Sequence, residues 1–204
     1  MKHIKVLGIT GGVGAGKSTV LTYLSKAYGA SVLQLDAAAH LLMEPSGVCY
    51  EQIVATFGRG ILGEDGSIDR GKLYRKTFNN EGQLQILNGI VHPRVKEYVR
   101  TWIEKKKQEK TAPFLVLEAA LLLEDHYDEI CDEIWYIHVD HTVREKRLMA
   151  SRGYSREKIE QILGNQKTEY EFCTACQFTV DNSSDILENT YEQIDKGIKE
   201  HEFV

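Results

Sequence analysis

The stretch Gly8-Ile-Thr-Gly-Gly-Val-Gly-Ala-Gly-Lys-Ser-Thr19 decides the fold of this 204-residue chain. From Gly11 to Ser18 it has the spacing Gly-x-x-x-x-Gly-Lys-Ser, the pattern of a phosphate-binding P-loop. Before it, residues 4–9 are apolar and rich in β-branched side chains, as in a buried strand. The residues after it place apolar side chains at helical spacing, at Val20, Leu21, Leu24 and Ala27. A strand, a glycine loop and a helix in this order form the context that the motif requires.

The residue types of this loop suit a polyphosphate ligand. Glycines let the backbone approach the phosphates, and the N-terminus of the following helix offers N–H donors and partial positive charge. Lys17 can reach the β- and γ-phosphates, and Ser18 can ligate the Mg²⁺ that bridges them. A glycine turn before an ordinary helix is the alternative, but the flanking strand and helix disfavour it. The expected ATP-binding residues of the loop are Gly12, Val13, Gly14, Ala15, Gly16, Lys17, Ser18 and Thr19.

The composition is that of a soluble globular protein without a strong charge bias. Hydrophobic residues make up 42% and charged residues 27%, and the formal net charge is -5, so we expect no nucleic-acid partner. No apolar run approaches the roughly 20 residues that span a membrane, and the first strand leaves no room for a signal peptide. Cys173-Thr-Ala-Cys176 lacks a second pair, which favours partly buried cysteines over zinc or redox chemistry. We therefore expect a cytoplasmic monomer or small homo-oligomer, away from membranes.

Beyond the P-loop, the chain predicts an α/β fold with a parallel central sheet. Further short strands are expected at residues 31–35, 114–117, 133–139 and 177–180. A closing amphipathic helix is expected over residues 185–199. The alternation of strands and helices stops after residue 57, and three helices are predicted at 72–78, 81–91 and 93–108. An all-helical stretch inside an α/β chain predicts an inserted substrate-binding subdomain.

Polar residues stand at the ends of three predicted strands, where open α/β sheets bind ligands. Asp36 could meet a ligand there or could only cap the following helix, and its position does not separate these readings. Glu118 could hold a Mg²⁺-bound water or could be a structural hydrogen-bonding group. Asn182 could contact an adenine with its amide, although an ordinary turn asparagine is commoner.

A dense charge pattern covers residues 140–167, where two helices are predicted to be joined by residues 151–154. Charge alone favours a solvated helix pair with i,i+3 and i,i+4 pairing. The P-loop changes this balance, because a transferring phosphoryl group needs further cations. We therefore predict a lid in which Arg144 and Arg147 face the phosphates.

Nearly the whole chain resembles the dephospho-CoA kinase family. The P-loop is common to many NTPases, so the resemblance is carried by an ordered set of further motifs: Asp36, Glu44-Pro-x-Gly47, Phe57-Gly58, Asp65-Gly66, Asp69-Arg70, His92-Pro93, Leu121-Leu-Leu-Glu124, Arg147-Leu, Gln166 and Asp181-Asn182. Two positions depart from the family pattern. Gln34 stands where many members carry a second aspartate, and Arg147 is followed by Ser151 and Arg152 where an arginine four residues on is usual.

The resemblance implies a three-layer P-loop kinase that phosphorylates the 3′-hydroxyl of dephospho-CoA with ATP and Mg²⁺, the last step of CoA synthesis. It implies one domain over residues 1–204, with a nucleotide-binding core of about 1–57 and 112–204. The same domain is expected to contain a helical CoA-binding insertion at about residues 58–111 and a lid at about residues 141–168. Asp36 is then the candidate base, with catalytic cations from Lys17, Arg144 and Arg147. Asp36, His92 and Arg94 are the candidate substrate-binding residues, and Asn182 joins the P-loop in binding ATP.

Two other functions share parts of this pattern. A kinase for nucleosides or another small metabolite would have the same core, but the helical insertion with His92-Pro93 distinguishes this chain from such a kinase. A P-loop GTPase switch would need an Asn-Lys-x-Asp motif, and no such run occurs in the sequence.

Overall fold

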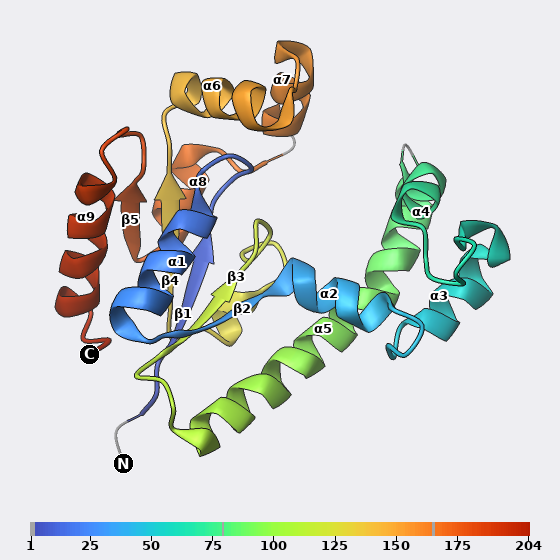
Figure 1. The fold of residues 1–204 in the computed structure, drawn as a ribbon, viewed down its shortest axis with the longest axis horizontal. Helices are drawn as coiled ribbons and strands as arrows, with labels where there is room; N and C mark the ends of the chain where they lie inside the picture. Colours follow the sequence, from blue (N-terminus) through green and yellow to red (C-terminus); the bar gives the residue numbers. More distant parts are fainter. Residues whose placement is uncertain (1–2, 79, 165) are drawn as a thin grey trace. The chain divides into compact units, whose positions relative to one another are not determined.

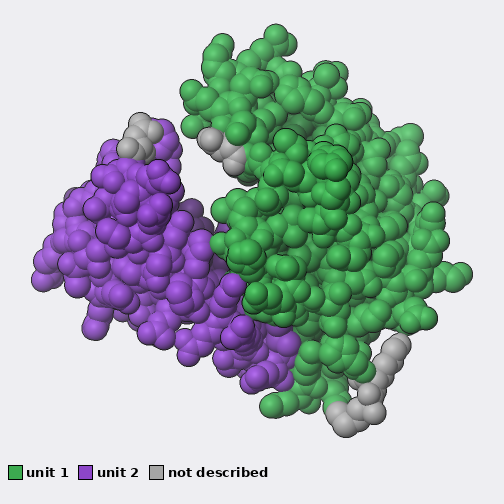
Figure 2. Space-filling model, turned by 180° about the vertical axis from the view of Figure 1, so that it is seen from behind, with its two compact units in different colours: residues 1–33, 106–204 green, residues 34–105 purple. Residues whose placement is uncertain are grey.

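The computed structural model describes residues 3–78, 80–164 and 166–204. Residues 79 and 165, which the expected insertion and lid ranges include, lie outside this described part. The chain divides into two compact units, coloured in Figure 2: unit 1 is residues 1–33 with 106–204, and unit 2 is residues 34–105.

Unit 1 is organised by a sheet with the strand order β2-β3-β1-β4-β5 among the described residues (Figure 1). The strands are β1 (Val6–Thr10), β2 (Ser31–Gln34), β3 (Leu115–Glu118), β4 (Glu133–His138) and β5 (Phe178–Asp181). β1 pairs in parallel with β3 and β4, and β4 with β5. Every residue of β1 is buried, as expected for a central strand covered on both faces. The predicted parallel sheet is confirmed, and the carboxyl ends of its strands meet at one edge.

Helices α1 (Lys17–Tyr28) and α9 (Leu187–Glu200) share one apolar core with the sheet. In α9 the buried residues recur at helical spacing, at Thr190, Ile194, Gly197 and Ile198. Two tyrosines join the helices, because the rings of Tyr23 and Tyr191 stack with centroids 4.0 Å apart. This packing fixes the helix that follows the P-loop.

The charged segment after β4 forms α6 (His141–Arg152) and α7 (Arg156–Gly164), as the sequence predicts. A short helix that the sequence analysis did not identify, α8 (Glu169–Ala175), follows them. It begins with a capping box, in which Thr168 and Glu171 exchange hydrogen bonds at the helix N-terminus. Cys173 lies exposed in this helix and Cys176 lies partly exposed at its end.

Unit 2 is helical. It contains α2 (Leu35–Met43), α3 (Tyr50–Phe57), α4 (Arg70–Thr77) and most of α5 (Glu81–Glu109), with a 3₁₀ turn at Arg59–Ile61. The expected insertion began near residue 58, whereas this compact unit also includes α2 and α3. Among all the described helices, none is long and apolar enough to cross a membrane.

The prediction of separate helices at 81–91 and 93–108 is wrong, because α5 runs through Pro93 without a break. Proline removes one helical hydrogen bond and crowds the preceding turn. In α5 the buried side chains continue at helical spacing on both sides of it, at Ile90, Val91, Val95, Val99 and Ile103. Tertiary burial of this stripe offsets the local cost of the proline.

Candidate functional site

The P-loop spans the gap between the end of β1 and the start of α1 and lies close against β4. Gly11 has φ 144°, and a Cβ atom there would lie 2.6 Å from the carbonyl oxygen of Ile137. Only glycine fits such an approach. The loop also closes on itself, since the N–H of Ala15 donates to Gly12 O (3.2 Å) and the N–H of Thr19 donates to Gly16 O (3.0 Å). These two hydrogen bonds within the loop stabilise its shape.

Lys17 lies at the start of α1, folded back over the loop. Its Nζ donates to the carbonyl oxygen of Gly11 (2.8 Å) and lies 3.5 Å from Oε1 of Glu118. Glu118 is 8% exposed and ends β3, beside Ile9 of β1. The parallel pairing of β1 and β3 thus brings the P-loop lysine and a buried carboxylate to the same edge of the sheet.

Two side chains near the loop offer oxygen atoms to a divalent cation. Ser18 follows Lys17 and is exposed, and Glu118 offers the nearby carboxylate. In residues 3–78, 80–164 and 166–204, no group of three or more His, Cys, Asp and Glu side chains could hold a metal ion. A Mg²⁺ that takes most of its ligands from phosphates and waters needs only one or two protein oxygens. The donor set around the loop fits such an ion.

Two arginines of α6 turn toward the P-loop side of unit 1. The Nε of Arg144 donates to the carbonyl oxygen of Val13 (2.7 Å), and its guanidinium also donates to the side-chain oxygen of Gln166. Burial lowers the pKa of Arg144 from its ordinary value, and the neighbouring Tyr136 opposes this shift. Arg147 donates from its two terminal nitrogens to the carbonyl oxygens of Asn182 (2.8 Å) and Ser184 (3.3 Å). These two side chains are therefore not part of a merely solvated helix face.

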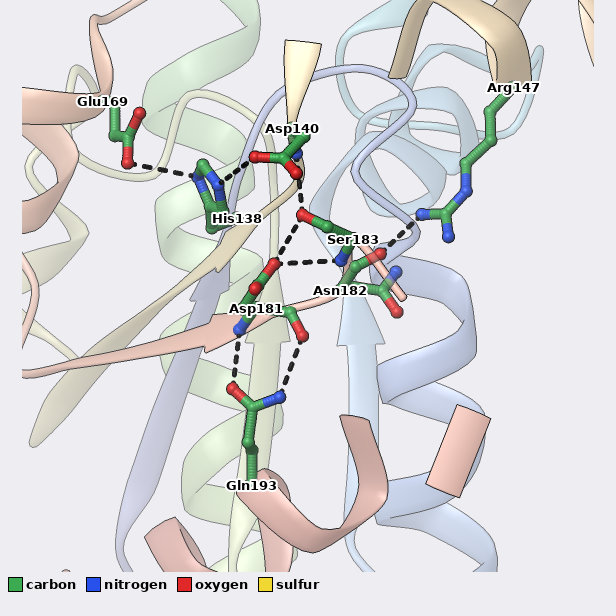
Figure 3. Close-up of polar contacts among 8 residues, drawn as sticks. All are labelled: His138, Asp140, Arg147, Glu169, Asp181, Asn182, Ser183 and Gln193. Atoms are coloured by element: carbon green, nitrogen blue, oxygen red, sulfur yellow. Dashed lines mark hydrogen bonds and ion pairs between the residues drawn. The ribbon is translucent and has the colours of Figure 1, made fainter. Parts of the chain in front are cut away.

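Figure 3 shows the polar contacts that fix the carboxyl ends of β4 and β5. Ser183 accepts from the N–H of Asp140 (2.8 Å) and donates its own N–H to the carboxylate of Asp181 (2.9 Å). The side-chain amide of Gln193 on α9 bonds both the N–H and the carbonyl oxygen of Asp181, each at 2.9 Å. His138 lies 3.6 Å from the carboxylate of Asp140 and 3.5 Å from that of Glu169.

Asn182 is buried at the end of β5, at 3% exposure. Its Nδ2 donates to the carbonyl oxygen of Ala15 (2.8 Å), and its Oδ1 accepts from the hydroxyl of Thr190 (2.9 Å). Both amide atoms thus have partners inside unit 1. Thr190 and Gln166 are site residues whose contacts the sequence analysis did not predict, although Gln166 belonged to the motif set.

The remaining predicted residues belong to unit 2. The reading of Asp36 as a helix cap is wrong, because α2 begins at Leu35 after Gln34, and Asp36 lies exposed within the first turn. One turn later, burial lowers the pKa of His40, aided by the charge of Arg70 and opposed by Asp36. On α5, His92 is partly buried, and Arg94 is exposed and bonds Glu97 at 3.0 Å.

Unit 2 also contains a pocket of about 280 Å³. Its lining combines apolar, polar and charged side chains from α2 and the residue after it, from the loop before α4 and from the first residue of α4, namely His40, Met43, Glu44, Ser67, Ile68 and Arg70. Asp36, His92 and Arg94 are not among the lining residues. Glu44 and Arg70 belonged to the motif set, but the sequence pattern could not show that they line a common pocket.

The sequence profile described as CoaE, dephospho-CoA kinase, matches residues 5–188. The chain belongs to this family. A dephospho-CoA kinase from Carboxydothermus hydrogenoformans is 37% identical over 197 residues, which cover 95% of this chain and 93% of that protein. Another from Fusobacterium nucleatum is 33% identical over 95% of this chain and 96% of its own length.

A solved structure supports the same fold over the whole chain. The crystal structure of TT1252 from Thermus thermophilus superposes with a TM-score of 0.85 at 28% identity, covering 98% of both chains. A dephospho-CoA kinase from Campylobacter jejuni superposes with a TM-score of 0.71 at 22% identity, covering 97% of this chain and 98% of that chain. The P-loop kinase fold predicted from the sequence is confirmed, and the family membership agrees with the motifs at the strand ends.

Proposed function

We propose that this chain transfers the γ-phosphoryl group of ATP to the 3′-hydroxyl of dephospho-CoA, giving CoA and ADP, the last step of CoA biosynthesis. Family membership over residues 5–188 supports this activity. The observation that carries it in the structure is the P-loop, with Lys17 over the loop and two α6 arginines bonded beside it. Phosphoryl transfer depends mainly on positioning and on cations that stabilise the transferring group.

The catalytic residues in this proposal have distinct roles. The Asp36 carboxylate accepts the proton of the 3′-hydroxyl as that oxygen bonds to the γ-phosphorus, and the bond from that phosphorus to the oxygen of ADP breaks. Lys17, Arg144 and Arg147 stabilise the charge on the transferring oxygens. The residues 12–19 and Asn182 bind ATP.

A Mg²⁺ held on the phosphates, with Ser18 and Glu118 as protein oxygen donors, would neutralise charge on the β- and γ-phosphates. The two oxygen donors near the loop support this assignment. We place the reaction in the cytoplasm because it consumes ATP.

We assign the acceptor to the helical insertion of about residues 58–111, with contacts from Asp36, His92 and Arg94, and the lid to about 141–168. The support is the helical composition of unit 2, the partial burial of His92 and the exposure of Arg94. In this division the core binds ATP, the insertion binds dephospho-CoA, and α6 and α7 close over the phosphates.

An acceptor panel tests the proposal. Initial rates of ADP release would be measured with ATP alone, with dephospho-CoA, with adenosine and with shikimate. We expect release to rise at least about a hundredfold over ATP alone only with dephospho-CoA. An equal or larger rise with adenosine or shikimate would contradict the proposed acceptor.

A further inference from the structure

Asn182 joins three parts of unit 1 at a single buried residue. Its N–H donates to the carbonyl oxygen of His138 at the end of β4 (2.9 Å), which places it in register beside that strand. Its carbonyl oxygen accepts from Arg147 of α6 (2.8 Å), and its side-chain Nδ2 donates to Ala15 O in the P-loop (2.8 Å). The side chain is therefore directed at the backbone of the phosphate-binding loop.

The contact at Ala15 has a consequence for the next residue. In a planar trans peptide, the carbonyl of one residue and the N–H of the next point in opposite directions. Because Asn182 holds the carbonyl oxygen of Ala15 toward itself, the N–H of Gly16 is directed away from Asn182. A backbone N–H in a P-loop is a donor for phosphate oxygens. The asparagine thereby sets the direction of one of the loop's donors.

The space around Gly16 also shows that Asn182 packs closely against the loop. Gly16 has φ 85°, and the nearest heavy atom to a Cβ built on it is the Nδ2 of Asn182, so a side chain at position 16 would displace the amide. The guanidinium of Arg147 is next, with one terminal nitrogen 3.9 Å from that Cβ position. Asn182 and the peptide between Ala15 and Gly16 are therefore packed as one group.

Thr190 decides which amide atom faces the loop. It is fully buried on α9, and its hydroxyl donates to the Oδ1 of Asn182 (2.9 Å). If the amide turned over, its oxygen would face the carbonyl oxygen of Ala15, and neither could donate. The threonine donor therefore favours the orientation in which Nδ2 holds the loop.

We propose that Asn182 and Thr190 are positioning residues for phosphate binding: Thr190 orients the amide, the amide holds the carbonyl of Ala15, and the N–H of Gly16 is thereby aimed at a phosphate oxygen. The inference rests on the proposed function only in that the loop binds polyphosphate. It gives Asn182 a role through the loop backbone in place of a contact with the adenine base, and it gives α9 a part in binding ATP.

The test compares two ligands that share the phosphates but not the base. Dissociation constants of Mg·ATP and of Mg·tripolyphosphate would be measured by titration calorimetry for the full chain and for Thr190→Val, which keeps the shape but removes the donor. We expect both ligands to bind at least about fivefold more weakly, by the same factor, because one oriented hydrogen bond is lost. Thr190→Ser, which keeps the hydroxyl, should restore both affinities to within about twofold of the parent.

A matched control is Thr77→Val in α4 of unit 2. Thr77 is also a buried threonine, but within the described part of the chain its hydroxyl bonds backbone carbonyl oxygens of its own helix, those of Leu73 (3.3 Å) and Tyr74 (3.2 Å). We expect this variant to bind both ligands as the parent does. If Thr190→Val does not fold, Asn182→Ala makes the same prediction of equal losses for the two ligands.

Two results would overturn the inference. A loss confined to Mg·ATP would show that position 182 acts on the base. Unchanged affinity for both ligands in folded Thr190→Val and Asn182→Ala would leave the two residues a structural role only. Neither binding measurement uses an acceptor, so a failure of the proposed acceptor would not alter the outcome.

Discussion

Asp36 and Lys17 show how two charged residues are presented by the helices that carry them. Lys17 opens α1, with its ammonium between Gly11 O and the buried carboxylate of Glu118. These are oxygen acceptors, as the phosphates of a nucleotide would be, so a ligand could replace them around the same cation. Asp36 lies exposed in the first turn of α2, where a carboxylate has a favourable interaction with the helix dipole.

The substitution Asp36→Asn separates a chemical role from a structural one. Asp36 is not the helix cap and is exposed, so the variant should melt within a few degrees of the parent. It should bind Mg·ATP normally but phosphorylate dephospho-CoA at least about a hundredfold more slowly, because the proton acceptor is lost. Single-turnover and steady-state rates would give the loss of turnover, and thermal melting of the same variant would give its stability. Parental turnover in the folded variant would remove Asp36 from the catalytic residues.

At the scale of the element, α6 carries cations whose surroundings differ along one helix. Arg144 and Arg147 bond carbonyl oxygens at Val13, Asn182 and Ser184, while Lys146 between them is exposed. The helix therefore has one face directed to the strand ends and the P-loop and one face in solvent. A comparison of the two faces tests the proposed role of α6 in a lid.

We predict that Arg147→Ala lowers kcat by about tenfold or more while raising the dissociation constant of Mg·ATP less, because the cation acts as charge redistributes in the transition state. Lys146→Ala is the matched control and should change neither. Rapid-mixing kinetics and titration calorimetry give the two quantities. A higher dissociation constant for Mg·ATP with kcat unchanged in Arg147→Ala would instead indicate uniform binding of ground and transition states.

Helix α2 carries His40, and the direction in which pH changes its contribution to stability can be worked out. The pKa of His40 is lowered by burial and by Arg70, so the unfolded chain binds a proton more readily than the folded chain. Stability from this group is therefore present above the ordinary histidine pKa of about 6.5 and is lost as the pH falls below it. Urea unfolding at pH 7.5 and at pH 5.5 should show a smaller decrease in His40→Gln than in the parent. An identical decrease in both chains would contradict this.

At the scale of the whole molecule, the chain consists of an α/β unit that carries the P-loop and a helical unit that carries Asp36, His92 and Arg94. If the acceptor binds to the helical unit, the two substrates have kinetically separable determinants. Arg94→Ala should then raise the KM for dephospho-CoA several-fold without changing the KM for ATP. Glu97→Ala, which removes the partner of Arg94 but keeps the cation, is the control. An increase confined to the KM for ATP would contradict the division.

The sequence predicted the parallel sheet and the P-loop because both depend on local patterns: short apolar runs, glycine spacing and helical periodicity. It failed where tertiary packing outweighs a local signal, as at Pro93, where burial of the α5 stripe keeps the helix continuous. It also could not predict the contacts of Asn182 with Ala15 and Thr190. Those pairs are 167 and 8 residues apart and meet only through the packing of β5 and α9 on the rest of unit 1.

The most direct test of the account is the identity of the products. The full chain, incubated with Mg·ATP and dephospho-CoA, should form CoA and ADP in equal amounts, with the new phosphate on the 3′-oxygen by phosphorus NMR. Lys17→Ala, shown to be folded by circular dichroism, should form both at least about a hundredfold more slowly, because it lacks the cation that we propose stabilises the transferring group. ADP formed without CoA, phosphate attached at another oxygen, or parental rates in Lys17→Ala would contradict the account.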